Sequence, residues 1–274
     1  MEHALNLLKN YFAQDRSTVS RATTVKDDKL TTPRSISINP NSVFRTLVVL
    51  AGLVLLVSLG SELGNIWNAT DSRVFPKLVK AFSVDRELNI PAFFSTMLLL
   101  ISSGLLACIA FLSYDGRLSS LRYWGVLALG FFWMAFDEMA SVHEKLIEPM
   151  RVLLGGENLG VFYFAWVVPG IIVVLLCAGW FFRFWLGLPF KTRIQFFVAG
   201  ALFLSGAVGM ELLDGDYAEV HGKITPTYAV LSTIEEMLEM AGVIVFIKAL
   251  LGYIADRFHR VELRFGANEQ REAK

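Results

Sequence analysis

The sequence predicts an all-α fold, a polytopic transmembrane bundle of six helices with both termini in the cytoplasm. Hydrophobic residues make up 54% of the 274 residues and charged residues only 18%, whereas about a quarter of an ordinary soluble domain is charged. The mean hydropathy is +0.52. Six apolar runs are each close to the roughly 20 residues that a helix needs to cross the hydrocarbon layer. Together these observations predict a multi-pass membrane protein.

The bundle is expected over residues 43–253, between two polar ends. Residues 1–42 are predicted to be cytoplasmic, with a short amphipathic helix near the start followed by a flexible linker. Residues 254–274 are predicted to form a cytoplasmic tail. Pro169 lies inside the fourth apolar run, and we expect it to kink that helix. The six predicted spans are 43–63, 88–114, 121–142, 158–182, 194–213 and 227–253.

Lysine and arginine residues near the span ends set the orientation. They are frequent in the N-terminal segment, in the loops after the second and fourth spans, and in the C-terminal tail, which places these segments on the cytoplasmic side. The loop after the first span disagrees, because it contains Arg73, Lys77, Lys80 and Arg86. An even number of spans agrees with two cytoplasmic ends. We expect the protein in a bacterial inner (plasma) membrane.

Several function classes find no support in the sequence. The formal net charge is zero, so the basic footprint of a nucleic-acid-binding protein is missing. Cys108 and Cys177 both lie in apolar runs, which favours small packing residues over a disulfide or a metal pair. The chain has no nucleophile elbow, no phosphate-binding glycine loop and no His-Glu-x-x-His motif.

In this topology, acidic residues gather at the non-cytoplasmic end of the bundle. They form three clusters that come from separate parts of the chain. The clusters lie at the end of the third span, at the end of the fifth, and in the first half of the sixth. Two of the four histidines, His143 and His221, lie with them. The acidic residues are Asp137, Glu138 and Glu144, then Glu211, Asp214, Asp216 and Glu219, then Glu235, Glu236 and Glu239.

Helical spacing predicts that each cluster directs at least two oxygen ligands to a common axis, since residues three, four or seven apart share a face. The predicted stripes are Asp137 with Ser141 and Glu144, Glu211 with Asp214, and Glu235 with Glu239. By the same spacing, His143 lies about a third of a turn away from the first stripe.

Depth in the membrane matters most for Glu235 and Glu239. If the sixth span begins near residue 227, they lie roughly 12–18 Å inside it. An unpaired carboxylate at such depth costs several kcal/mol, so we expect these groups to be protonated, paired or bound to a cation. The alternative is a span that starts later, with both acids at the interface. Asp137 and its neighbours likewise fit a helix that simply leaves the membrane.

Carboxylates and two histidines on several helices are ligands typical of a dinuclear iron or manganese site. The Glu-x-x-His pairs of such sites are missing. A zinc site with His143, His221 and one carboxylate, or an oxygen-rich calcium or manganese site, is compatible too. The suspected cofactor is therefore a divalent ion, Fe, Mn or Zn, with Ca also open. The candidate metal ligands are Asp137, His143, Glu144, Glu211, Asp214, His221, Glu235 and Glu239.

Three hypotheses of different classes follow. The first is a membrane-embedded metalloenzyme, a hydrolase or an oxidoreductase, that acts on a lipid-like substrate. The second is an ion- or proton-coupled transporter that uses the intramembrane glutamates, with Pro169-Gly170 as the break in a helix. The third is an accessory or assembly subunit that binds a membrane protein partner or forms a homo-oligomer. In each hypothesis the lipid bilayer is a partner of the protein, and none of them involves nucleic acid.

Overall fold

The computed structural model describes residues 38–67, 74–86, 88–114, 118–156 and 158–258. Apart from Ile38, which belongs to the unit Met1–Ile38, these residues belong to the unit Asn39–Lys274. The predicted N-terminal amphipathic helix and residues 259–274 of the predicted tail lie outside the described residues. Every described element is a helix, which confirms the all-α prediction.

The described elements follow one another as helices joined by short turns. Five of them are long and apolar enough to cross a membrane: α2, α4, α7, the continuous stretch α8 to α9, and α10. A sixth candidate joins most of α5 to the residues after its end, at an angle of 73°. The chain is thus a multi-pass membrane protein with five or six spans. The elements are α2 (Pro40–Trp67), α3 (Phe75–Phe82), α4 (Ile90–Leu112), α5 (Leu118–Ala140), η1 (Glu144–Leu146), α6 (Ile147–Leu154), η2 (Gly160–Phe162), α7 (Val167–Leu186), α8 (Phe190–Leu204), η3 (Ser205–Met210), α9 (Glu211–His221) and α10 (Pro226–Phe258).

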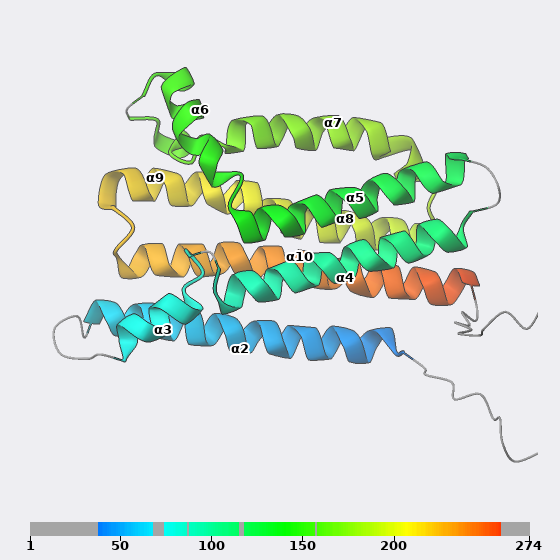
Figure 1. The fold of residues 1–274 in the computed structure, drawn as a ribbon, viewed down its shortest axis with the longest axis horizontal. Coiled ribbons are helices and arrows are strands. Elements are labelled where there is room, and N and C mark those ends of the chain that lie inside the picture. Colours follow the sequence, from blue (N-terminus) through cyan, green and yellow to red (C-terminus); the bar gives the residue numbers. More distant parts are fainter. Residues whose placement is uncertain (1–37, 68–73, 87, 115–117, 157, 259–274) are drawn as a thin grey trace, which may run out of the picture. The chain divides into compact units, whose positions relative to one another are not determined.

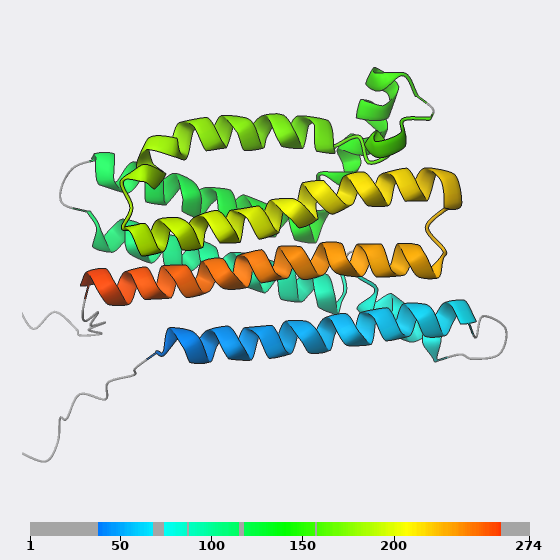
Figure 2. The same cartoon turned by 180° about the vertical axis from the view of Figure 1, so that it is seen from behind.

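Helix α10 is the centre of the bundle, because it packs against α2, α4, α8, η3 and α9. Helices α4 and α5 pair with each other, and α7 lies along one side (Figures 1 and 2). The long helices run roughly parallel or antiparallel to one another. We call the end at which α5 and α9 finish and α7 and α10 begin the acidic end, since the predicted acidic clusters lie there.

The apolar core consists of two clusters along α10. The cluster nearer the acidic end joins α2, α4, α5 and α10, and includes the fully buried Leu98, Met240 and Ile244. The other joins α4, α5, α8 and α10, where Leu106 and Leu250 are also fully buried. Both faces of α10 are therefore covered over much of its length, which fixes the rotation of its acidic residues.

A short loop before α4 is held in place by local hydrogen bonds. Asn89 caps α4, because its side-chain oxygen accepts from the backbone N–H of Ala92 at 3.1 Å, as is typical of a helix start. The hydroxyl of Ser58 on α2 accepts from the N–H of Val84 at 3.2 Å. These bonds position Asp85, between the two anchors, beside the acidic end.

The prediction that Pro169 kinks the fourth span is wrong, and so is the predicted start of that span at residue 158. The helix begins at Val167 and continues to Leu186, with the preceding residues forming turns and η2. Pro169 therefore lies in the first turn, where the missing N–H would have no helical partner in any case. The broken helix that the transporter hypothesis used is not formed at this position.

Candidate functional site

A cavity of about 430 Å³ opens at the acidic end, between α4, α5, α7, η3 and α10. Its lining contains eight carboxylates but only two residues with a fixed positive charge, Arg86 and Lys223. The rest of the wall is largely aliphatic and aromatic, with Leu98, Val173 and Phe203 as examples. The cavity therefore combines a strongly acidic part with an apolar part. The carboxylates belong to Asp85, Asp137, Glu138, Glu144, Glu211, Glu235, Glu236 and Glu239.

Six of the eight candidate ligands predicted from the sequence line this cavity: Asp137, His143, Glu144, Glu211, Glu235 and Glu239. Asp214 is buried next to the cavity, outside its lining. His221, at the end of α9, is exposed and stacks on the ring of Tyr217, with the ring centroids 4.4 Å apart. The zinc hypothesis that pairs His221 with His143 therefore lacks one of its ligands in this cavity.

The end of α5 turns His143 toward Asp137. Helix α5 stops at Ala140, and Ser141 adopts a left-handed conformation with φ of 47°. The carboxylate of Asp137 accepts from the backbone N–H of His143 at 2.9 Å, and its second oxygen lies 2.8 Å from His143 Nδ1. The predicted continuous face of Asp137, Ser141 and Glu144 is wrong, because the helix ends before Ser141.

His143 lies in this turn, beyond the end of α5. Burial alone would lower the pKa of its ring, but the hydrogen bond and the charge of Asp137 work in the opposite direction. The charges of Glu211 and Glu144 add to that effect, and the net result is a raised pKa for His143. Since a carboxylate oxygen only accepts, Nδ1 carries a proton in this pair.

A π-helical turn, η3, connects α8 to α9 and decides where the carboxylate of Glu211 lies. Gly206 in this turn packs against α10 so closely that an added Cβ would lie 2.7 Å from the carbonyl oxygen of Glu235. It would also lie 2.7 Å from Cγ of Glu239. Inserted π-turns are frequent at functional sites. Here the turn and the close approach bring the acids of α9 and α10 to one cavity.

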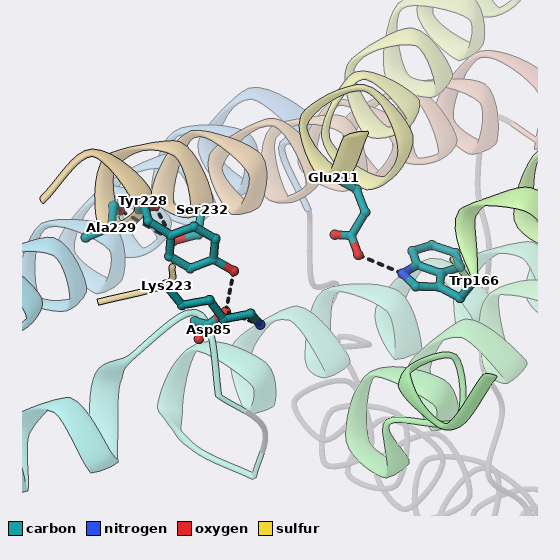
Figure 3. A network of polar contacts seen from close by, with 7 residues as sticks. All are labelled: Asp85, Trp166, Glu211, Lys223, Tyr228, Ala229 and Ser232. Atoms are coloured by element: carbon teal, nitrogen blue, oxygen red, sulfur yellow. Dashed lines mark hydrogen bonds and ion pairs between the residues drawn. The ribbon is translucent and has the colours of Figure 1, made fainter. Parts of the chain in front are cut away.

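Two hydrogen-bonded groups, drawn in Figure 3, fix the mouth of the cavity. Trp166, just before α7, donates its indole N–H to Glu211 Oε1 at 2.7 Å. Asp85 Oδ1 accepts from the hydroxyl of Tyr228 at 2.8 Å and lies 3.4 Å from Lys223 Nζ. The loop before α4 is thus connected to the start of α10, and the start of α7 to α9.

The ammonium of Lys223 shows which chemistry this region accommodates. Its Nζ lies 4.6 Å from the centroid of the Phe164 ring and 5.7 Å from that of Tyr228, within the range of cation–π attraction. Asp85 supplies the opposite charge. A cationic nitrogen at the mouth of the cavity is therefore already held by a carboxylate together with aromatic rings.

Asp214 is the least satisfied polar group in the described part of the chain. Its side chain is 0% exposed, and neither carboxylate oxygen makes a well-aligned hydrogen bond with a described residue. The carboxyl group of Glu235 lies within hydrogen-bonding reach of Asp214, and the charges of Glu211, Asp85 and Lys223 act on it as well. Burying one carboxyl group beside another is costly, so this position points to a functional demand beside the cavity.

Sequence reasoning missed three residues of the site and the role of a fourth. Trp166 bonds to the predicted acid Glu211, and Asp85 and Tyr228 contact each other and Lys223. Each of the three lies in an ordinary loop or helix start without a recognisable motif. Glu219, a predicted member of the acidic cluster, instead accepts from the backbone N–H groups of Leu159 and Gly160. It ties the connection before α7 to α9, which is a structural role.

The predicted metal site finds no support in this arrangement. Within residues 38–258, apart from the short gaps in the description, no group of three or more His, Cys, Asp or Glu side chains is placed to hold a metal ion. The carboxyl groups of Glu211 and Glu235 hydrogen-bond with each other, Glu239 lies near them, and the remaining acids line the same cavity. Their arrangement suits a ligand that fills the space between them.

Comparison with known proteins gives a family and no individual relative. Residues 45–253, well over half of the chain, match the sequence model of a family described as "Domain of unknown function (DUF8692)". No curated protein and no solved structure matches the chain.

Proposed function

We propose that this chain, which belongs to the DUF8692 family, binds a lipid-like molecule whose cationic head occupies the acidic cavity. The observation that carries the proposal is the composition of the cavity wall, with eight carboxylates against two fixed cations and an otherwise largely apolar lining. A cationic head group would offset the excess of acidic over basic side chains, and the apolar part of the wall suits the hydrocarbon part of an amphiphile. The position between candidate membrane helices makes the bilayer the natural source of such a ligand.

Two further observations support a cationic nitrogen in the head group. Lys223 is held at the mouth by Asp85 and the ring of Phe164, so the protein already uses this environment for an ammonium. Asp214 is fully buried and lies beside Glu235, so a further acidic group stands next to the cavity wall. An aromatic ring next to carboxylates is the common way to recognise alkylated ammonium groups.

The distribution of Lys and Arg favours an acidic end that faces away from the cytoplasm, with both termini inside. In a bacterial plasma membrane this arrangement opens the cavity to the periplasm or the exterior. The head group of a lipid in the outer leaflet would then reach the carboxylates of α10 without crossing the membrane.

A binding assay with matched head groups tests the proposal. Dodecyltrimethylammonium, dodecyl sulfate and dodecyl maltoside share a chain and differ in charge. We expect the cationic compound alone, added to the protein in neutral micelles, to raise the melting temperature, because a ligand that binds only the folded state stabilises it. Glu235→Gln removes an acidic group that a bound cation would ionise, and should weaken binding about tenfold or more, which corresponds to about 1.4 kcal/mol.

Glu148→Gln is the matched control, since Glu148 is exposed on α6 and does not line the cavity. It should bind as the unaltered protein does. Glu239→Gln provides a second cavity variant if Glu235→Gln does not fold. Equal stabilisation by all three head groups, or unchanged affinity in both cavity variants, would refute the proposal.

A metal-dependent reaction in the same cavity is a second candidate, and one observation favours it. The hydrogen bond that His143 Nδ1 donates to Asp137 leaves Nε2 as the other ring nitrogen, and carboxylates orient metal-binding histidines in this way. Bound iron, manganese, zinc or calcium would require Glu144, Glu211, Glu235 or Glu239 to move together. Elemental analysis of the purified protein beside Glu239→Gln tests it, and substoichiometric metal in the unaltered protein would dismiss this candidate.

A further inference from the structure

A second hollow, a groove of about 460 Å³, lies between α7 and the stretch formed by α8 and η3. From Ala201 to Gly209 it follows that stretch for roughly 12 Å, at 1.5 Å per residue. Its lining is apolar except for Ser205, whose hydroxyl donates to the carbonyl oxygen of Ala201 at 2.7 Å. The groove therefore offers an apolar surface whose hydroxyl is already bonded.

The groove and the acidic cavity share part of their walls. Val174 on α7, Leu204 on α8 and Val208 on η3 line both. The two hollows are therefore adjacent, with these three side chains on the boundary that a ligand's chain would follow from the cavity to the groove. The polar part of this path lies at the acidic end, and the apolar part lies along α7.

Helix α7 is the least enclosed of the long helices, with only 6% of its apolar window buried. It contacts η3 near the acidic end, and toward its other end Phe184 packs against the rings of Tyr123 and Trp124 on α5. Ile172, Leu175 and Leu176 are all exposed, as expected for a helix that faces lipid over most of its circumference. The groove beneath α7 is thus open to the bilayer at its side.

We infer that this groove holds the alkyl chain of the amphiphile whose cationic head lies in the acidic cavity, and that the ligand reaches both from the bilayer, between α7 and α8. The inference rests on the proposed function for the nature of the head group. Transfer of a chain from lipid to the groove brings little gain by burial, because lipid tails are equally apolar. The carboxylates supply the selectivity, and the groove fixes the direction in which the chain leaves the head.

Photocrosslinking locates the chain directly. The probe is an alkyltrimethylammonium with a diazirine near the end of its chain, added to the full-length protein in neutral micelles. We expect labelled peptides from Ile171–Leu175 and Ala201–Gly209, and at least about a tenfold loss of label there when excess dodecyltrimethylammonium competes. Dodecyl maltoside in equal excess should leave the label in place.

Filling the groove gives an independent measurement. Ala201 is exposed and lines the groove, so Ala201→Phe should block the chain without disturbing the core. Ala178→Phe is the control, because Ala178 is equally exposed on α7 but lies outside the lining. The first variant should lose the competable label, whereas the control should keep it.

The outcomes separate the two proposals. If the cationic compound stabilises the protein but the label falls on the lipid-facing surface of α2, or is unaffected by Ala201→Phe, the groove is only a site for surrounding lipid and the inference is overturned. If no cationic compound binds and Glu235→Gln changes nothing, the proposed function itself fails.

Discussion

The close approach of η3 and α10 at Gly206 predicts that replacing a glycine by alanine destabilises the protein at this position, whereas the same change at an open position stabilises it slightly. A methyl group in Gly206→Ala would meet the carbonyl oxygen of Glu235 at 2.7 Å and the backbone nitrogen of Glu239 at 3.1 Å. Both contacts involve the backbone, so no rotation of a side chain relieves them. The first distance must lengthen to about 3.4 Å before the contact is ordinary, and α10 has to move away from η3.

The expected cost follows from two opposing effects. Overpacking of this kind costs about 1–3 kcal/mol, and we expect the upper part of that range because the clash is with backbone atoms. Replacing glycine by alanine inside a helix returns about 0.5–1 kcal/mol. The variant should therefore be destabilised by about 2 kcal/mol, which lowers the melting temperature by about 4–8 °C in a domain of 150–250 residues.

Gly200→Ala is the matched control on the same continuous helix, because a Cβ at Gly200 meets nothing within 4 Å. It should raise the melting temperature slightly, through helix propensity alone. Thermal unfolding in neutral micelles, followed by circular dichroism, measures both. Gly206→Ala should also weaken binding of the cationic probe, since it displaces Glu235 and Glu239 from the cavity wall. Equal melting temperatures for the two variants would show that η3 and α10 do not approach as described.

Two further perturbations address the polar groups at the mouth of the cavity. The raised pKa of His143 means that its pair with Asp137 stabilises the fold fully below the unfolded value of about 6.5, and that this contribution disappears as the pH rises through the folded value. The melting temperature of the unaltered protein should therefore fall, relative to that of Asp137→Asn, as the pH rises above about 6.5. Parallel pH profiles for the two proteins would contradict this. Trp166→Phe keeps a ring but loses the donor to Glu211, and a double-mutant cycle with Glu211→Leu should give a coupling of about 1.5–3 kcal/mol, the usual range for a bond to a charged group. A coupling near zero would mean that this bond does not form.

The sequence alone was sufficient to predict the class of protein. Apolar runs long enough to cross a membrane are a local property, and no packing is needed to recognise them. The predicted runs correspond to α2, α4, α5, α7, the stretch α8 to α9, and α10. The convergence of the acids followed from topology alone, because alternate helix ends must meet on the same side. Six of the eight candidate residues line one cavity for this reason.

The sequence also indicated which positions would be hard to satisfy. A carboxylate among apolar residues needs a partner wherever the helix lies. The sequence indicated Glu235 and Glu239 on this ground, and both line the cavity, whereas the burial of Asp214 was not predicted. The choice between proton, organic cation and metal ion depends on distances between several helices, and composition does not contain those distances.

The tertiary structure alone decided which face each acid presents and which neighbours it meets. The helical stripe through Asp137 failed because the chain leaves the helix at Ser141, and the same bend turns His143 toward that carboxylate. The π-turn and the close approach at Gly206 set Glu211 into the cavity. Such features arise from contacts between helices distant in sequence, whereas hydropathy and spacing describe each helix separately. The sequence therefore determined that acids meet at one end of a membrane bundle, and the packing determined that they surround a cavity.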